Sequence, residues 1–198
     1  MKKVGIVLAG GEGKRAGGHD KGLLTLNNIP LVQHVIEKIK DDLDTLFISA
    51  NRNFDFYHSF SYPVVRDKPE YCHKGPLGGI ASVYTRIPKN TEMVMVVPCD
   101  VPFLPKKIVS LMTKSLLSQV DYEIAYASTL QRIHPSIHLF KYSIGVGIAH
   151  HLNHGEYSLK SWIFKHKVIK TLFPDEKAFI NMNDLTLLNR YQHNHDGL

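Results

Sequence analysis

The sequence contains little cysteine and no long hydrophobic segment. Cys72 and Cys99 are the only cysteines among 198 residues, and they do not form a C-x-x-C pair. Neither a disulfide framework nor a zinc knuckle is therefore expected. No apolar run approaches the roughly 20 residues that a membrane helix requires, and the apolar stretch after Met1–Lys3 is too short for the core of a signal peptide. These absences predict a cytoplasmic protein without a membrane segment.

Acidic residues are also fewer than basic ones, with 18 Asp and Glu against 24 Lys and Arg and a formal net charge of +6. A basic surface favours anionic partners. The cations are spread along the chain and no nucleic-acid-binding motif is present, so we expect phosphorylated small molecules rather than nucleic acid. None of the twelve histidines belongs to a known metal-ligand arrangement. All but His134 are interpreted as scattered surface residues.

What the chain does contain is a glycine-rich, basic loop near its N-terminus. The apolar run 4–8 predicts a short buried strand, and it leads into five glycines and three cations between Gly10 and Lys21. Glycine allows close approach of the backbone to a ligand and positive φ, and consecutive backbone N–H groups can cradle phosphate oxygens. Lys14, Arg15 and Lys21 can neutralise the charge on those oxygens. The loop therefore predicts a nucleoside triphosphate site.

Two common nucleotide motifs do not account for this loop. A Walker A motif requires Gly-Lys-Ser/Thr, whereas Arg15 follows Gly13-Lys14 here and no hydroxyl is available for magnesium. The dinucleotide pattern G-x-G-x-x-G/A matches at Gly11, Gly13 and Ala16. However, Gly17-Gly18 would interrupt the helix that this pattern should open, and no acidic ribose-binding residue lies between 31 and 35. We interpret the match as coincidental.

A third motif agrees better. The loop has the order Leu8-Ala9-Gly10-Gly11, then Arg15, then Gly17-Gly18, and finally Asp20-Lys21-Gly22-Leu23-Leu24. This order resembles the signature of nucleotidyltransferases, and among them the molybdenum cofactor guanylyltransferases, which join GMP to molybdopterin. The related cytidylyl enzymes carry Leu-Ala-Ala-Gly at the strand end. A simple glycine-rich turn would leave the five glycines and Lys21 unexplained together.

The rest of the chain predicts the fold. Residues 23–26 are expected to form a short extended piece. Apolar strand-like runs at 46–49, 62–65 and 93–97 alternate with helical patterns at 31–39, 75–87 and 105–117. Two further strands at 122–128 and 133–140, and helices at 144–151, at 159–164 and through Tyr191, follow. This alternation predicts an α/β fold: one domain over 1–198 with a mostly parallel, Rossmann-like nucleotidyltransferase sheet and helices on both faces.

Residues just beyond the strand ends are the candidates for nucleotide binding, because ligands of open parallel sheets bind there. Asn51 follows the strand 46–49, and Ser49 stands where the family often has asparagine. Asp67 matches an aspartate of the family, although a turn aspartate is the alternative; the glycines of 75–79 match a pocket-lining segment, although helix–sheet packing would also explain them. The resemblance implies nucleotide contacts from Leu8, Ala9, Gly10, Gly11, Gly13, Lys21, Ser49, Asn51, Asp67, Gly78 and Asp100.

Asp100 is the candidate magnesium ligand. It follows the apolar run 93–97 and lies between Pro98 and Pro102, in a Cys-Asp-x-Pro motif that resembles the family's metal site. Mg²⁺ prefers carboxylate oxygens and shares its coordination sphere with phosphates and water. Capping of a helix that begins near Pro105 is the weaker alternative. The resemblance makes Arg15, Lys21 and Asp100 the catalytic residues and Mg²⁺ the cofactor.

The second substrate is expected to contact residues from the second half of the chain. His134 belongs to a His-Pro-Ser segment, and Asn181 and Asn183 to a Phe-x-Asn-x-Asn segment, both of which resemble acceptor-binding segments of the family. Capping of the last helix by Asn183 or Asp184 is an equally weighted alternative.

The resemblance implies transfer of GMP from GTP to molybdopterin with release of pyrophosphate. The expected partners are GTP, molybdopterin and molybdoenzyme chaperones or other cofactor-biosynthesis proteins, and the protein is expected to be a monomer. Two alternatives remain. One is a nucleotidyltransferase with another base or acceptor, such as a cytidylyl or sugar-phosphate enzyme; the other is a non-catalytic carrier of the finished dinucleotide. Lys21 and Asp100 argue against the carrier.

Overall fold

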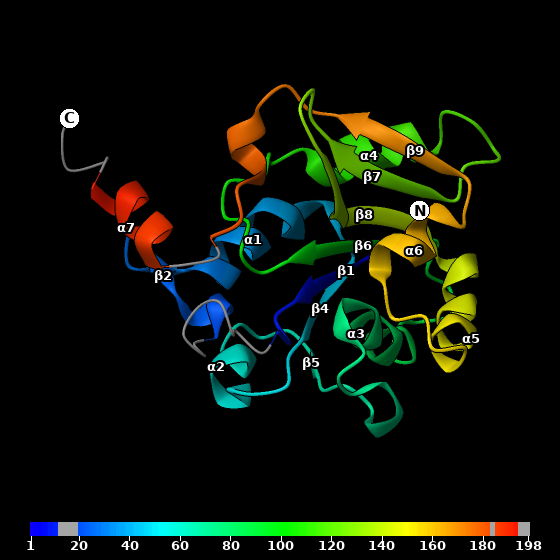
Figure 1. Ribbon diagram of the computed structural model, residues 1–198, viewed down its shortest axis with the longest axis horizontal. Helices are drawn as coiled ribbons and strands as arrows, with labels where there is room; N and C mark the ends of the chain where they lie inside the picture. Colours follow the sequence, from blue (N-terminus) through cyan, green and yellow to red (C-terminus); the bar gives the residue numbers. More distant parts are fainter. Residues whose placement is uncertain (12–19, 183–184, 194–198) are drawn as a thin grey trace.

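The computed structural model describes residues 1–11, 20–182 and 185–193. Their main feature is a seven-stranded sheet of order β5-β4-β1-β6-β8-β7-β9 (Figure 1). Its strands are β1 (Lys3–Leu8), β4 (Thr45–Ser49), β5 (Val64–Val65), β6 (Met93–Pro98), β7 (Ile124–Ser128), β8 (Ile133–Lys141) and β9 (Val168–Leu172). Within this sheet β8 pairs antiparallel with β6 and β7, and the other pairings are parallel. The prediction of a mostly parallel sheet is confirmed.

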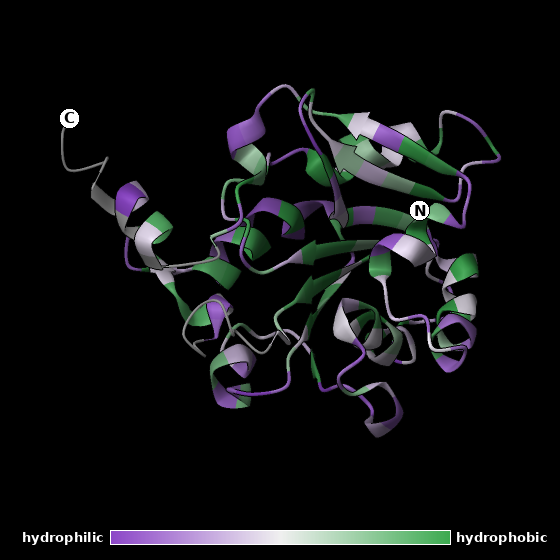
Figure 2. Cartoon of the chain, in the orientation of Figure 1, coloured by the Kyte–Doolittle hydropathy of each residue, from purple (hydrophilic) through white to green (hydrophobic). Residues whose placement is uncertain are grey.

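The central strands β1, β4 and β6 are apolar over 4–8, 46–48 and 93–98, because both of their faces are covered. In β1, Val4 and Ile6 belong to one buried cluster and Val7 to the other, as the two-residue period of a strand requires. The first cluster packs under α3 (Gly75–Tyr84), α5 (Gly147–Asn153) and α6 (Leu159–Phe164), and the second under α1 (Leu31–Ile39) and α4 (Ile108–Leu116). In Figure 2 the strands β1 and β6 are green between these helices. The prediction of helices on both faces is confirmed.

Several element predictions differ from the structure. Residues 23–26 are not one extended piece: a 3-10 turn, η2 (Lys21–Leu23), precedes a hairpin of β2 (Thr25–Leu26) and β3 (Ile29–Pro30). Asn27 and Asn28 connect these strands with φ values of 52° and 61°, which is the geometry that a two-residue type I′ hairpin loop requires. The Asn-Asn pair was the available signal for this turn.

Helix boundaries also differ from the predictions. The predicted helix 105–117 begins only at Ile108, where the N–H of Ile108 bonds to the carbonyl of Pro105 at 3.0 Å. The predicted helix 144–151 is a 3-10 segment, η5 (Tyr142–Val146), followed by α5. The remaining helical elements are α2 (Phe54–His58), η3 (Lys40–Asp42), η4 (Pro69–Tyr71), η6 (Glu176–Phe179) and α7 (Leu185–His193).

Two histidines are not at the surface, in contrast to the prediction. The His138 side chain on β8 is fully buried near Phe140 and Trp162, and His151 on α5 is only 7% exposed. Burial lowers the pKa of His138 to about 4, because the charged ring would lose its solvation. Among the described residues, no helix is long and apolar enough to cross a membrane.

Candidate active site

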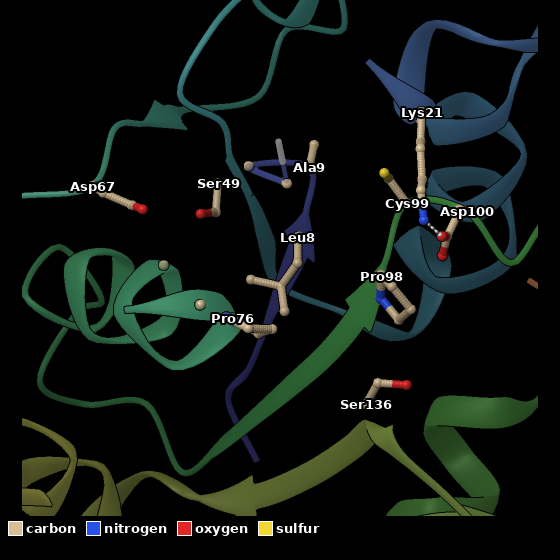
Figure 3. A pocket seen from close by; sticks show the side chains of 14 residues that line it. Leu8, Ala9, Lys21, Ser49, Asp67, Pro76, Pro98, Cys99, Asp100 and Ser136 are labelled. Atoms are coloured by element: carbon tan, nitrogen blue, oxygen red, sulfur yellow. Dashed lines mark hydrogen bonds and ion pairs between the residues drawn. The ribbon is translucent and has the colours of Figure 1, made fainter. Parts of the chain in front are cut away.

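A cleft opens at the carboxyl ends of β1, β4 and β6. Leu8 of β1 is level with Ser49 of β4 and with Pro98 of β6, so the three strands end side by side. The cleft has a volume of about 490 Å³, and we call it the first cleft (Figure 3). Its lining residues are Leu8, Ala9, Gly10, Gly11, Lys21, Ser49, Asp67, Gly75, Pro76, Gly79, Pro98, Cys99, Asp100 and Ser136.

An ion pair lies at one end of the first cleft. Lys21 Nζ is 3.0 Å from Asp100 Oδ2, and the side chains are 25% and 8% exposed. The other carboxylate oxygen, Asp100 Oδ1, is buried and has no hydrogen-bond partner among the described residues. A buried carboxylate oxygen without a partner is unfavourable in water-free surroundings, so this atom is suited to receive a cation or a donor from a ligand.

Lys21 is positioned by its neighbour Asp20. The buried Asp20 carboxylate accepts hydrogen bonds from the backbone N–H of Gly22, from Tyr57 at 2.7 Å and from Asn53 at 2.9 Å. A side chain at Gly22 would overlap the Tyr57 hydroxyl, so glycine is required for this contact. Burial, then the neighbouring Cys99 and Asp20, raise the pKa of Tyr57; the phenol therefore keeps its proton and remains a donor. The Asp-Lys-Gly run thus anchors the backbone that carries Lys21.

The opposite end of the first cleft contains Ser49 and Asp67 (Figure 3). Asn51 donates a hydrogen bond to Asp67 Oδ2 at 2.9 Å and accepts one from the Asp67 N–H at 3.0 Å. It also donates to the carbonyl of Gly10 at 3.4 Å. Asp67 Oδ1 is buried and has no hydrogen-bond partner among the described residues. Burial raises the pKa of Asp67, and the bond from Asn51 partly offsets this.

The start of α3 forms the floor beside these residues. Gly75, Pro76 and Gly79 line the first cleft, whereas Gly78 does not. A side chain at Gly78 would meet the backbone carbonyl of Tyr71 instead. A Cβ atom at Gly79 would lie 2.6 Å from Ser49 Oγ and 3.5 Å from Asp67 Oδ1. Gly79 therefore allows a close approach of helix and strand, and it lines the first cleft in place of Gly78, for which a nucleotide contact is predicted.

A second cleft, of about 610 Å³, adjoins the first. It is lined by Gln131, Arg132, Ile133, His134, Pro135, Ser136, Glu176, Phe179, Ile180, Asn181 and Leu187. Ser136 borders both clefts. It reaches this junction because the β7–β8 pairing shifts from Tyr126↔His138 to Ala127↔His134, which makes residues 135–137 bulge from the ladder.

Two of the three predicted acceptor residues therefore lie together. The His134 ring stacks on Phe179 with centroids 4.8 Å apart, and the exposed Asn181 lies beside Met182, whose N–H bonds to the carbonyl of Asp100 at 2.8 Å. That bond ties the segment that carries Asn181 to the end of β6. Gly13, Arg15 and Asn183 lie outside the described residues.

The comparisons with known proteins agree with this geometry. A family model described as MobA-like NTP transferase domain matches residues 5–169. The chain belongs to this family. Molybdenum cofactor guanylyltransferases of Shewanella halifaxensis and Shewanella piezotolerans are 36% and 37% identical to it over 90% of the chain and cover 88% and 86% of their own lengths.

A solved structure shows the same fold. Molybdopterin-guanine dinucleotide biosynthesis protein A of Archaeoglobus fulgidus superimposes with a TM-score of 0.72 at 18% identity, and the likeness covers 99% of this chain and 100% of that one. The nucleotidyltransferase fold inferred from the sequence is thereby confirmed, and the chain has the domain of a nucleotidyltransferase.

Within this MobA-like domain the described residues contain no group of three His, Cys, Asp or Glu side chains that could hold a metal ion. The unpartnered Oδ1 of Asp100 nevertheless fits a divalent cation that takes one carboxylate from the protein and its other ligands from phosphates and water, as Mg²⁺ does. A dedicated protein cage is not needed for that mode of binding.

Sequence reasoning missed several residues of the two clefts. Pro76 and Gly79 are three residues apart on α3 and therefore share a helix face. Cys99 and Pro98 adjoin Asp100 in sequence. Ser136 belongs to the His-Pro-Ser segment, but its place between the two clefts depends on the β-bulge. Glu176 carried no comparable signal, because its position depends on a turn far along the chain.

Proposed function

We propose that this protein transfers GMP from GTP to molybdopterin, releases pyrophosphate and forms molybdopterin guanine dinucleotide. The observation that carries the proposal is the convergence of Gly10, Gly11, Lys21 and Asp100 in the first cleft, which meets the second cleft at Ser136. A reaction between two bound phosphates needs two adjoining sites of this kind. The names of the similar Shewanella proteins favour the same reaction.

In this proposal GTP occupies the first cleft. Backbone N–H groups of Gly10 and Gly11 face the phosphates. Ser49 and Asp67 face the guanosine, with Asn51 as the brace of Asp67. The free oxygen of the Asp67 carboxylate is an acceptor, and the adjacent N–H donors of guanine match it. Gly78 does not contact the nucleotide in this proposal. Its backbone helps to position the neighbouring Gly79, which lines the first cleft.

The chemistry follows from charge and geometry. The terminal phosphate of molybdopterin attacks the α-phosphorus of GTP in line, a new P–O bond forms, and the bond to the β-phosphate breaks so that pyrophosphate leaves. Lys21, and Arg15 beyond the described residues, stabilise charge on the phosphates. Mg²⁺ held by Asp100 would supply further neutralisation of the triphosphate. No general base is required, because a phosphate dianion is already a nucleophile.

The acceptor occupies the second cleft in this proposal. His134 and Asn181 provide polar groups for the pterin, and Asn183 and Gly13, outside the described residues, keep the roles that the resemblance implies. Ser136 marks the junction where the two phosphates meet. We also propose that residues 1–198 form a single domain and that the protein is a cytoplasmic monomer. It would pass its product to molybdoenzyme chaperones or other cofactor-biosynthesis proteins.

The test is incubation of the protein with molybdopterin, Mg²⁺ and either GTP, CTP or ATP, followed by the mass of the product. A GMP adduct with strong preference for GTP is expected. Comparable efficiency with CTP would reject the guanylyl assignment and leave a nucleotidyltransferase of other specificity. Tight binding of molybdopterin guanine dinucleotide without turnover would favour a carrier.

A further inference from the structure

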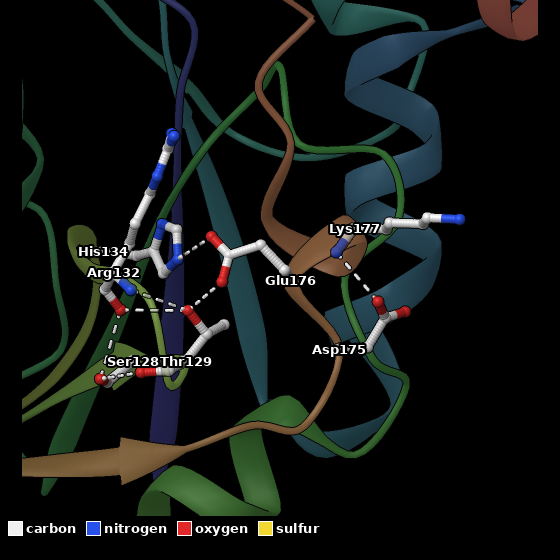
Figure 4. Close-up of polar contacts among 7 residues, drawn as sticks. All are labelled: Ser128, Thr129, Arg132, His134, Asp175, Glu176 and Lys177. Carbon is white, nitrogen blue, oxygen red and sulfur yellow. Dashed lines mark hydrogen bonds and ion pairs between the residues drawn. The ribbon is translucent and has the colours of Figure 1, made fainter.

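Hydrogen bonds join Glu176 on η6 to Thr129 and Arg132 in the turn between β7 and β8, and the Glu176 carboxylate also faces the His134 ring without a hydrogen bond (Figure 4). We call these four residues the network; Arg132, His134 and Glu176 line the second cleft, and the buried Thr129 lies behind them. The helix that carries Glu176 is also fixed at its start, because Asp175 caps η6 by accepting a hydrogen bond from the Lys177 N–H at 2.9 Å. The network therefore joins two segments that are both fixed by the fold.

Thr129 determines which carboxylate oxygen of Glu176 is available to other groups. The Thr129 hydroxyl accepts a hydrogen bond from the Arg132 N–H at 3.1 Å and has one proton to donate. Two acceptors lie within its reach, the Arg132 carbonyl at 3.2 Å and Glu176 Oε2; the proton goes to Glu176, because a charged carboxylate is the stronger acceptor. Glu176 Oε1 then faces His134 Nε2 at 3.8 Å. Thr129 is only 5% exposed, so water does not compete freely for this contact.

The His134 ring has one nitrogen directed toward this carboxylate. Nε2 is buried and has no hydrogen-bond partner at hydrogen-bond distance among the described residues, and Glu176 is the acceptor nearest to satisfying it. Nδ1, on another edge of the ring, makes no hydrogen bond within the described residues. The stack on Phe179, at an interplanar angle of 19°, restrains rotation of the ring. A neutral imidazole carries its proton on only one nitrogen.

We propose that Glu176, held by Thr129, is a positioning residue that fixes His134 in the tautomer with the proton on Nε2. Nδ1 is then left as a hydrogen-bond acceptor for an N–H donor of the heterocycle that enters the second cleft. The hydrogen bond from the heterocycle to Nδ1, which we call the substrate half of this inference, rests on the proposed function. The tautomer that Glu176 fixes does not depend on that function.

The charges around His134 make the proposal testable by pH. Burial is the main cause that lowers the pKa of His134; Glu176 opposes it, and Arg132 lowers the pKa further. A protonated ring has no lone pair at Nδ1, so acceptor binding weakens as the pH falls through this pKa. Loss of the Glu176 charge moves that acidic limb to lower pH, and loss of the Arg132 charge moves it to higher pH. The two variants shift the profile in opposite directions.

The experiment combines ¹⁵N NMR of the histidine rings with steady-state kinetics. The variants are Glu176→Gln, Thr129→Val and Thr129→Ser, with His134→Gln to assign the His134 signals. Glu156→Gln is the matched control, because Glu156 Oε2 lies 3.4 Å from His151 Nε2 in a second Glu–His pair, on α5 and the loop that follows it.

Wild type, Thr129→Ser and the control should show a proton on Nε2 of His134 and an unprotonated Nδ1. Glu176→Gln and Thr129→Val should show mixed tautomers, and their KM for molybdopterin should rise about tenfold, the scale of one lost hydrogen bond. The KM for GTP should stay unchanged. Arg132→Gln should move the acidic limb upward.

A wild-type His134 with its proton on Nδ1 would overturn the proposal. So would lower thermal stability of Glu176→Gln with an unchanged KM for molybdopterin and an unchanged acidic limb, because the network would then be merely structural. If the wild type forms no GMP adduct, the proposed function fails and the substrate half fails with it. The tautomer result would still decide the role of Glu176 toward His134.

Discussion

Lys21 and Asp100 are 79 positions apart in sequence, yet their side chains form an ion pair of 3.0 Å. Asp100 comes just after β6, which is adjacent and parallel to β1, and Lys21 begins η2, which Asp20 anchors through the Gly22 N–H. The Lys21 ammonium group neutralises the Asp100 carboxylate at the point where a bound triphosphate would add negative charge. A bound nucleotide therefore meets a site whose charges are already balanced, and Asp100 Oδ1 remains available to a metal ion.

Substitution of Lys21 should reduce the rate. Lys21→Ala removes the cation that faces the phosphates, and we expect a loss of about 3 kcal/mol in transition-state stabilisation, as for other preorganised donors. The measurement is kcat at saturating GTP. Lys40→Ala, which removes an exposed cation paired with Glu37, is the control. A rate close to that of wild type would exclude the proposed role of Lys21.

Gly79 should be intolerant of a methyl group. In Gly79→Ala the new Cβ would lie 2.6 Å from Ser49 Oγ, so Ser49 must move and GTP affinity should fall. Gly147→Ala adds the same methyl group to a helix where nothing lies within 4 Å, and it should leave binding unchanged. The double variant Gly79→Ala/Ser49→Ala should recover part of the affinity. Equal GTP binding by Gly79→Ala and wild type would show that this close approach does not shape the site.

Substitution of Asn181 should weaken binding of the acceptor molybdopterin and leave GTP binding unchanged. Its side chain is exposed in the second cleft, so Asn181→Ala removes a polar contact without disturbing the core. We expect a higher KM for molybdopterin and an unchanged KM for GTP. If the variant instead shows a lower melting temperature with normal acceptor kinetics, Asn181 has a structural role.

The sequence predicted the centre of this fold better than its edges. β1, β4 and β6 are covered on both faces, and positions 4–8, 46–48 and 93–98 in them are therefore apolar, which is a strong signal. β9 is an edge strand with only Thr171 buried along its length, so its pattern was too weak to predict. α2 has five residues, fewer than two helical turns, and no periodicity can be recognised over that length.

The same limit applies to the candidate site. Asp100 and Lys21 could be predicted because each follows a recognisable strand or glycine motif. The hydrogen bonds of Asn51 to Asp67 and Gly10 could not, because they depend on the spacing between β4 and β5. Glu176 has no motif at all, and its contact with Thr129 exists only because η6 packs against the β7–β8 turn.

Stability should depend on pH through His138. This ring is fully buried and its pKa is lowered to about 4, against about 6.5 in the unfolded chain. The unfolded state therefore binds more protons, and stability present above pH 6.5 is lost as the pH falls toward 4. Between pH 7.5 and pH 5 the loss from this group should be about 2 kcal/mol. Urea unfolding of wild type and His138→Phe measures it: the variant should lose less stability over this interval, and equal losses would contradict the assignment.

Asp100 tests the central claim, which is that the ends of β1 and β6 form a magnesium-dependent nucleotide site. Asp100→Asn keeps the shape of the side chain and removes its charge, and an amide oxygen is the poorer ligand for Mg²⁺. Most turnover should be lost, GTP binding in the presence of Mg²⁺ should weaken, and metal-free binding of GDP should stay nearly intact. Higher Mg²⁺ should rescue the variant only in part.

The decisive measurement is the affinity for GTP by calorimetry, with and without Mg²⁺, for wild type and Asp100→Asn. We expect Mg²⁺ to strengthen GTP binding strongly in wild type and only weakly in the variant. Equal strengthening of GTP binding by Mg²⁺ in the two proteins would show that Asp100 is not the metal ligand and would contradict the proposed mechanism.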